Sequence, residues 1–356
     1  MKKKRKTTMY NRKCISALLG VILMTALYGC TEKSADDKPT ESEVGLFAMD
    51  TYMSLKAYGP NADKSLQNAS ERITQLESLL SVTDSGSEIY RLNNAEGKET
   101  PLSPETGFLI RSSLEFGSET NGAFDITLYP VSKEWGFTTG SYKVPSEERI
   151  KELLEKTGSD NISLSNDGSG ALLKNGANID LGGIAKGYAG SCAAEILKDD
   201  GIESAILNMG GNVQTVGTKP DGNAWKVGIQ DPEDSSKLVG MVSVADKAVV
   251  TSGGYERYFE DDDGNIYWHI LDPKTGYPAQ SDIISVTVIG SDGTICDALS
   301  TSLFVMGTEG ASAYLKNHSE LGAVIVSRDR KLYITENIRD NFKSSGDFAG
   351  CEIIII

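Results

Sequence analysis

The sequence predicts an α+β fold in which helices surround a largely antiparallel sheet. Apolar residues recur at helical spacing mainly in the first half of the chain, whereas runs rich in β-branched residues cluster in the second half. Helices and strands follow one another irregularly, without the regular alternation of a parallel βαβ sheet. We expect one domain from about Val44 onward, because no linker or repeat divides these residues. Two lobes with the site between them would also suit a segment of this length.

Helical periodicity is clearest at residues 61–81, where Leu66, Ala69, Ile73 and later apolar residues recur every three or four positions. The same spacing predicts further helices at 104–118, 146–157, 184–199, 296–306 and 309–318. Alternating or β-branched apolar residues predict strands at 203–208, 224–230, 238–244, 283–289, 322–327 and 331–335.

Residues 1–29 have the pattern of a secretory signal. MKKKRKTTMYNRK carries seven positive charges and no acid, and an apolar run from Ile15 to Leu27 follows it. The run is short for a permanent membrane span, and small residues close it before Cys30. The stretch LYGC resembles a bacterial lipobox, which implies cleavage before Cys30, lipidation of its thiol and an extracytoplasmic protein anchored to the bacterial cell membrane. An uncleaved N-terminal anchor is the alternative.

Residues 30–43 are polar and lack apolar periodicity, so we expect a flexible tether ahead of the domain at 44–356. Seven of the 35 basic residues precede residue 30, which leaves 28 basic against 50 acidic residues and a net charge of −22. A surface of this charge repels phosphate backbones and anionic headgroups, which argues against nucleic acid and against lipid binding beyond the anchor. A phosphate ligand would therefore need a metal ion.

A double glycine opens the first segment with chemical interest, NIDLGGIAKGYAGSCAAEIL at 178–197. Gly182 and Gly183 let a ligand approach the backbone, and the helix that follows offers its first N–H groups to an anion. The spacing matches neither the dinucleotide fingerprint nor the P-loop. Taken alone, the pair is also compatible with a plain turn.

The second segment, CDALSTSLFVM at 296–306, places Asp297 and Thr301 four residues apart at the start of an apolar helix. That spacing puts a carboxylate and a hydroxyl on one helix face, and both are hard oxygen donors suited to Mg²⁺. The alternative is structural: Asp297 caps the helix and Thr301 bonds backward to the chain.

The third segment, NGAFDITLYPVSKEWGF at 121–137, is an expected loop with four aromatic residues. These rings would either pack on a flat heterocycle or cover part of the core. The ring-bearing residues are Phe124, Tyr129, Trp135 and Phe137.

The fourth segment, 251–278, contains His269, one of only two histidines in the chain. An Asp-Pro and a Thr-Gly follow it, so the imidazole stands at the mouth of a tight turn. No cysteine and no second histidine lie nearby, which excludes a histidine-rich metal site and leaves acid/base chemistry as the functional reading. A half-buried structural histidine is the alternative.

Together these motifs resemble the ApbE family of FAD:protein FMN transferases. The resemblance is carried, in this order, by AFD followed by WGF, DLGGIAKGYA, SGGYERYF, HILDPKTGYP and DALSTSLFVMG, and it extends over residues 45 to about 340. It implies an ApbE-like fold and a chain that moves the FMN part of FAD onto a Thr or Ser hydroxyl of an acceptor protein and releases AMP.

The resemblance also implies roles for individual residues. His269 matches the general base. Asp297 and Thr301 match ligands of Mg²⁺, joined by the carbonyl of Gly183 and with Ser300 beside the metal. Positions that match contacts to FAD are Met49, Tyr90, Ala123, Phe124, Asp125, Asp180, Lys186 and Leu271.

Three positions depart from the family pattern: Asp50 stands where Gly is usual, Asn212 where Asp is common, and Gly254 where an acid is often seen. The expected partners are FAD and an acceptor flavoprotein subunit of a membrane or extracytoplasmic redox system. Two other functions use the same features: an FAD pyrophosphatase that yields FMN and AMP, and a flavin-binding lipoprotein without catalysis. The joint presence of His269 and the pair at 297 and 301 favours catalysis.

Overall fold

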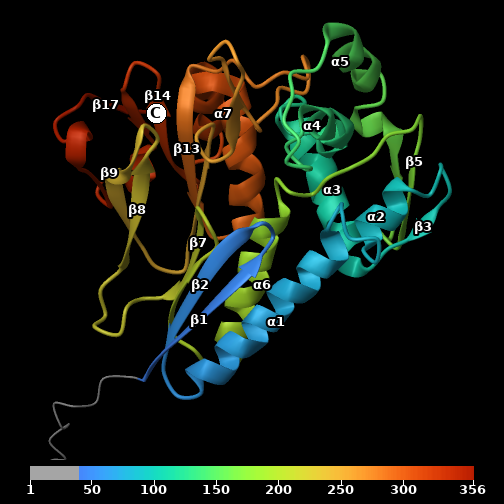
Figure 1. Cartoon of the computed structure of the whole chain (residues 1–356). Helices are drawn as coiled ribbons and strands as arrows, with labels where there is room; N and C mark the ends of the chain where they lie inside the picture. The colour runs from blue at the N-terminus through green and yellow to red at the C-terminus, as the bar shows by residue number, and fades with distance from the viewer. Residues whose placement is uncertain (1–39) are drawn as a thin grey trace, which may run out of the picture. The chain divides into compact units, whose positions relative to one another are not determined.

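A computed structural model describes residues 40–356, which form one compact unit with helices beside a large sheet (Figure 1). Its helices are α1 (Ala62–Leu80), α2 (Glu88–Asn93), α3 (Pro104–Glu119), α4 (Tyr129–Trp135), α5 (Glu147–Leu154), α6 (Ala185–Asp199) and α7 (Gly293–Lys316). Short 3-10 turns lie at Ile126–Leu128, Ser159–Asn161, Glu336–Ile338 and Gly346–Phe348. Within these described residues, no helix is both long and apolar enough to cross a bilayer.

The central element within residues 40–356 is a nine-stranded sheet, antiparallel except between its last two strands. Its spatial order is β1 (Glu41–Ala48), β2 (Thr51–Tyr58), β6 (Ser204–Asn208), β7 (Asn212–Gly217), β10 (Ala248–Gly253), β13 (Ile283–Gly290), β14 (Gly322–Ser327), β15 (Leu332–Ile334) and β17 (Ile353–Ile355). Three smaller sheets are β16 (Phe342–Ser344) with β9 (Asp234–Val244) and β8 (Trp225–Asp231), β3 (Thr100–Pro101) with β5 (Gly170–Leu173) and β4 (Ile162–Leu164), and β11 (Tyr258–Glu260) with β12 (Ile266–Trp268). The expected α+β class with largely antiparallel sheet is confirmed.

At β13 both faces of the large sheet are covered, which explains the almost continuous apolar sequence of this strand. Val286 and Val288 face the helices and pack in the same core as Leu299 and Leu303 of α7. Their neighbour Ile289 belongs to a second core, shared with the sheet of β8, β9 and β16. Alternation along one strand therefore fills two layers of core at once.

The N-terminal hairpin and the aromatic segment differ from the sequence predictions. β1 begins at Glu41, slightly before the expected start of the domain at Val44, and β1 and β2 are strands that the periodicity did not reveal. The aromatic segment is not a loop: it forms a 3-10 turn and α4, whose Trp135 is fully buried. The expected signal at 1–29 and tether residues 30–39 lie outside the described residues.

The two helices expected at 296–306 and 309–318 are one element, α7, with a break at Gly307. Gly307 has φ 74° and ψ 173°, a conformation that only glycine adopts without strain. The helix resumes directly behind it, where the Thr308 N–H donates to Asp282 at 2.9 Å. The gap between the two predicted helices thus corresponds to the break in α7 at Gly307.

Helices α6 and α7 cross at their first turns with no side chain between them. A Cβ at Gly187 would collide with the Gly293 carbonyl and come within 2.6 Å of the Asp297 Cβ. The approach also lets the Gly187 N–H donate to Asp297 Oδ2 at 2.8 Å. Glycine at 187 therefore sets the distance between the two helices.

Replacing Gly187 by Ala should lower the free energy of unfolding by about 1–3 kcal/mol, the usual cost of overpacking a tight contact. Gly190→Ala is the matched control one turn along α6, because a Cβ there meets chiefly the flexible end of Met209. Urea unfolding followed by circular dichroism measures both variants. Equal midpoints for the two would show that the crossing tolerates a methyl group.

Candidate active site

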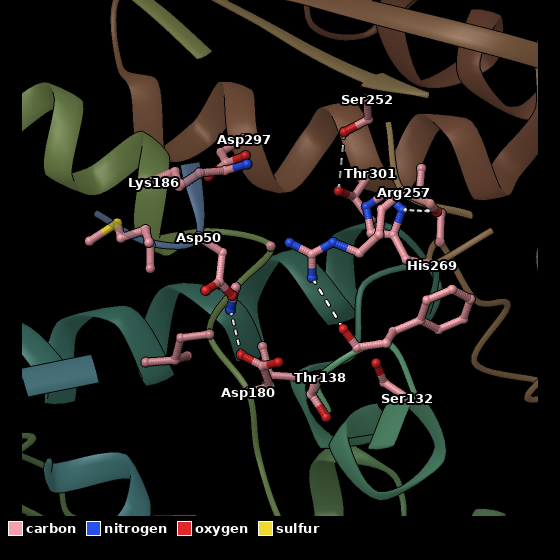
Figure 2. Close-up of a pocket in the computed structure, with 18 of the residues that line it drawn as sticks. Asp50, Ser132, Thr138, Asp180, Lys186, Ser252, Arg257, His269, Asp297 and Thr301 are labelled. Atoms are coloured by element: carbon pink, nitrogen blue, oxygen red, sulfur yellow. Dashed lines mark hydrogen bonds between the residues drawn. The ribbon is translucent and has the colours of Figure 1, made fainter. Parts of the chain in front are cut away.

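A cavity of about 380 Å³ gathers segments that are far apart in the sequence (Figure 2). Its walls come from the β1–β2 turn, the end of α1, residues 123–138, the start of α6, the β6–β7 turn, the stretch 250–257, residues 269–271 and α7. Eleven residues expected in the site line this cavity: Met49, Ala123, Phe124, Asp125, Asp180, Gly183, Lys186, His269, Leu271, Asp297 and Thr301.

Two expected site residues lie elsewhere. Tyr90, on α2, is half-buried and does not line the cavity. Ser300 is fully buried, and its hydroxyl donates to the Asp297 carbonyl at 2.9 Å and lies 2.7 Å from Ser252 Oγ. Ser252 in turn lies 3.4 Å from Thr301 Oγ1, so Ser300 does not line the cavity but contacts two residues that do, Asp297 and Ser252.

The backbone of Arg257 fixes the orientation of His269. The Arg257 carbonyl accepts the His269 backbone N–H at 3.1 Å and lies 3.1 Å from His269 Nδ1. A carbonyl only accepts, so Nδ1 carries the proton and Nε2 keeps its lone pair. Desolvation and the nearby charges of Arg257 and Lys186 lower the pKa of His269 from 6.5 to about 4. The imidazole is therefore a neutral base at neutral pH.

Asp297 does not cap its own helix. Asp292 does so, accepting the Thr294 N–H at 2.7 Å, and Asp297 lies more than a turn inside α7. Its carboxylate instead accepts the Gly187 N–H in the first turn of α6, where a helix dipole favours negative charge. Burial raises the pKa of Asp297, partly offset by Lys186 and by this hydrogen bond. A buried carboxylate so placed is suited to a cation.

The oxygen atoms around Asp297 fit a small, hard cation. Thr301 and Gly183 line the same cavity, and Asn212 is 2% exposed with neither atom of its amide hydrogen-bonded. Within residues 40–356, no cluster of three or more His, Cys, Asp or Glu side chains could hold a metal by itself. Mg²⁺ matches such a sparse set, because it usually takes one or two carboxylates and completes its shell with waters and substrate phosphates.

Two cations face the cavity, Lys186 at the start of α6 and Arg257 beside the histidine. Figure 2 shows the Arg257 side chain reaching into the cavity, where its Nη1 donates to the Phe137 carbonyl at 3.4 Å. The sequence singled out Lys186 and missed Arg257. The stretch SGGYERYF contains Arg257, but a cation in a β-rich segment is ordinarily solvent-exposed. The sequence therefore did not indicate that Arg257 faces the cavity.

Carboxylates outnumber these cations. Asp50, Asp125, Asp180, Glu256 and Asp297 all line the cavity. Desolvation raises the pKa of Asp180. Glu256 faces the cavity, and desolvation raises the pKa of its carboxyl to about 7. Carboxylates near the two cationic side chains therefore disfavour an anionic ligand least when Asp180 and Glu256 are protonated.

Left-handed turns and aromatic rings shape the cavity. Met49 and Asp50 have φ values of 51° and 59°, which identify the β1–β2 connection as a tight hairpin turn, and the Met49 N–H donates to Glu77 on α1 at 2.6 Å. Asp50 thus takes a conformation that glycine adopts more easily. Phe124 packs against Gly183, where a Cβ would lie 3.1 Å from the ring. Trp135 fills the core, as one of the two expectations has it, whereas Phe124, Tyr129 and Phe137 line the cavity; their packing on a flat heterocycle stays a prediction.

Two relatives of this chain share one name. A protein of Klebsiella pneumoniae (strain 342) called FAD:protein FMN transferase is 33% identical over 273 residues, which are 76% of this chain and 84% of that protein. An Escherichia coli (strain K12) protein of the same name is 30% identical over 310 residues, 83% of this chain and 88% of that protein.

Solved structures agree with the fold. The crystal structure of the ApbE protein of Thermotoga maritima aligns with a TM-score of 0.80 at 33% identity, covering 86% of this chain and all of that one. The apo form of the Pseudomonas stutzeri flavinyl transferase ApbE aligns with a TM-score of 0.73 at 29% identity, covering 82% and 92%. The sequence model of the ApbE family matches residues 49–325. The chain therefore belongs to the ApbE family.

Proposed function

We propose that this protein is an FAD:protein FMN transferase that moves the FMN part of FAD onto a Thr or Ser hydroxyl of an acceptor protein and releases AMP. The observation that carries the proposal is one cavity that combines a neutral His269 with the hard oxygen donors of Asp297 and Thr301. A protein that only stores flavin needs a pocket but no base. The names of the relatives from Klebsiella and Escherichia support the same reaction.

The residues of the cavity suggest how FAD is held. Lys186, at the N-terminal end of α6, offers a cation to the pyrophosphate, while the Gly187 N–H of the same turn is committed to Asp297. Arg257 supplies a second cation beside His269. Asp297, Thr301 and the Gly183 carbonyl would hold Mg²⁺, which when bound neutralises phosphate charge and polarises phosphorus.

The chemical step is a transfer between two oxygen atoms. The acceptor hydroxyl attacks the phosphorus on the FMN side, a new P–O bond forms, and the P–O bond to AMP breaks. His269 Nε2 takes the hydroxyl proton, because Nδ1–H is committed to the Arg257 carbonyl. A base is needed because an alcohol is a weak nucleophile near neutral pH. The same site with water in place of the hydroxyl would hydrolyse FAD to FMN and AMP.

His269→Ala should retain FAD binding and lose roughly 10²-fold or more of the transfer rate, the usual contribution of a positioned general base. The assay supplies FAD, Mg²⁺ and a test acceptor that bears the Asp-x-x-(Ser/Thr)-Gly-x-Thr sequence modified by this family, and it follows flavin fluorescence in denaturing gels. In wild type, kcat/KM should fall only toward pH 4, where the free enzyme's His269 becomes protonated.

Two controls make the histidine test specific. His318→Ala changes the other histidine, which lies outside the cavity and contacts the Tyr314 carbonyl, so transfer should stay at the wild-type rate. If kcat/KM also changes near pH 7, we assign that change to Glu256, and it should be absent from the Glu256→Gln variant. Wild-type rates in His269→Ala would refute the assignment of the base.

Asp297→Asn should abolish the response to Mg²⁺ while keeping the fold, because the amide oxygen can still accept from Gly187. Burial raises the pKa of Asp297 above its unfolded value, so ionisation of this group lowers stability as pH rises. The metal-free variant should therefore melt above metal-free wild type at pH 7. Added Mg²⁺ should raise Tm only in wild type, since it binds the folded state there. Equal Mg²⁺ shifts in both proteins would place the metal elsewhere.

We also propose that the mature protein is lipidated at Cys30 and anchored to the bacterial cell membrane on its extracytoplasmic side, with a flavoprotein subunit of a membrane or extracytoplasmic redox system as acceptor. This proposal rests on three features of the first 30 residues, namely the positively charged start, the apolar run that follows it and the LYGC stretch that ends at Cys30. Cys30→Ala should leave the protein unprocessed or released. Membrane fractionation and the mass of the purified protein check this, and an unchanged mass and membrane fraction would contradict lipidation.

A further inference from the structure

Two aromatic side chains stand exposed at the end of the β1–β2 hairpin. Phe47 is 73% exposed and Tyr52 67% exposed, the two largest values among the large apolar side chains of residues 40–356. They are direct cross-strand partners, so both rings lie on the same face of the hairpin. The opposite face packs Leu55 and Met53 into the core with α1. The exposure is thus confined to one face.

A glycine next to the two rings keeps this aromatic surface flat. Gly45 precedes Phe47 on the same face of β1, and a Cβ at Gly45 would collide with the Tyr52 hydroxyl. The Tyr52 ring therefore lies along the strand over a position without a side chain. Farther from the turn the face becomes charged, with Lys56 in ion pairs to Glu41 and Glu43. An apolar pair with a polar border is the pattern of a protein contact.

The pair flanks a turn that lines the cavity. The two residues of the turn between β1 and β2, Met49 and Asp50, line the cavity, and Phe47 and Tyr52 lie on either side of that turn. Glu77 holds the turn in place through the Met49 N–H. A macromolecule whose hydroxyl enters the cavity must pass the β1–β2 turn, which the aromatic pair flanks.

We propose that Phe47 and Tyr52 form a docking surface for the folded acceptor protein. The inference rests on the proposed function, which requires a protein substrate at this rim. A membrane is a poorer occupant, because the strongly acidic domain repels anionic headgroups. Aromatic side chains are the commonest anchors of protein interfaces.

The test compares Phe47→Thr/Tyr52→Thr with wild type and with Phe108→Ala. Threonine keeps strand propensity, and Phe108 is a comparably exposed aromatic (46%) on α3 that does not line the cavity. With the folded test acceptor, the double variant should raise KM roughly 10-fold or more while kcat, FAD affinity and Tm stay near wild type. Phe108→Ala should change none of these.

The possible outcomes separate this inference from the proposed function. A wild type that binds FAD but never modifies the acceptor refutes both. A wild type that transfers FMN, together with a double variant of unchanged KM, refutes the docking surface alone. Loss of binding to phosphatidylglycerol vesicles, or loss of self-association in sedimentation, with unchanged KM would assign the aromatic pair to a membrane or to a second copy instead.

Discussion

The contact between Gly187 of α6 and the first turns of α7 is the constraint on which the site depends. Without a side chain at 187 the two helices approach until a backbone N–H reaches Asp297. The same approach brings the start of α6, with Lys186, to the carboxylate. One glycine thus joins the packing of the core to the position of a carboxylate, a cation and a helix N-terminus, the three groups that a metal-bound phosphate needs.

The second requirement is a base that stays neutral among charges. Arg257 provides it in two ways, since its carbonyl orients the His269 ring and its guanidinium helps to lower the pKa of that ring. The aromatic cluster around Trp135 supports this arrangement, because Trp135 Nε1 donates to the Gly276 carbonyl at 2.8 Å and Phe137 stands edge-on to His269 with ring centres 6.4 Å apart. The proposed base His269 and the proposed metal ligand Asp297 thus line the same cavity.

Periodicity predicted α1, α3 and α6 well, because each buries one apolar face. It missed β1 and β2, whose alternation is diluted by Glu, Ser and Gly and whose pairing through β6 is visible only in three dimensions. Among the site residues, motifs identified His269, Lys186 and Asp297. Arg257 was not identified, and Asn212 stood out only as a departure from the family pattern, because the cavity that both residues line is visible only in three dimensions. Tyr90 matched a motif position but does not line that cavity.

The central claim is that this cavity transfers FMN to protein rather than storing flavin or hydrolysing FAD. The most direct measurement is the ratio of AMP released to FMN covalently bound to the test acceptor, obtained by chromatography and intact-protein mass spectrometry in one reaction with FAD and Mg²⁺. We expect one AMP for each FMN attached through a phosphoester to Thr or Ser. AMP with free FMN and an unmodified acceptor, or FAD bound without any AMP, would contradict the account.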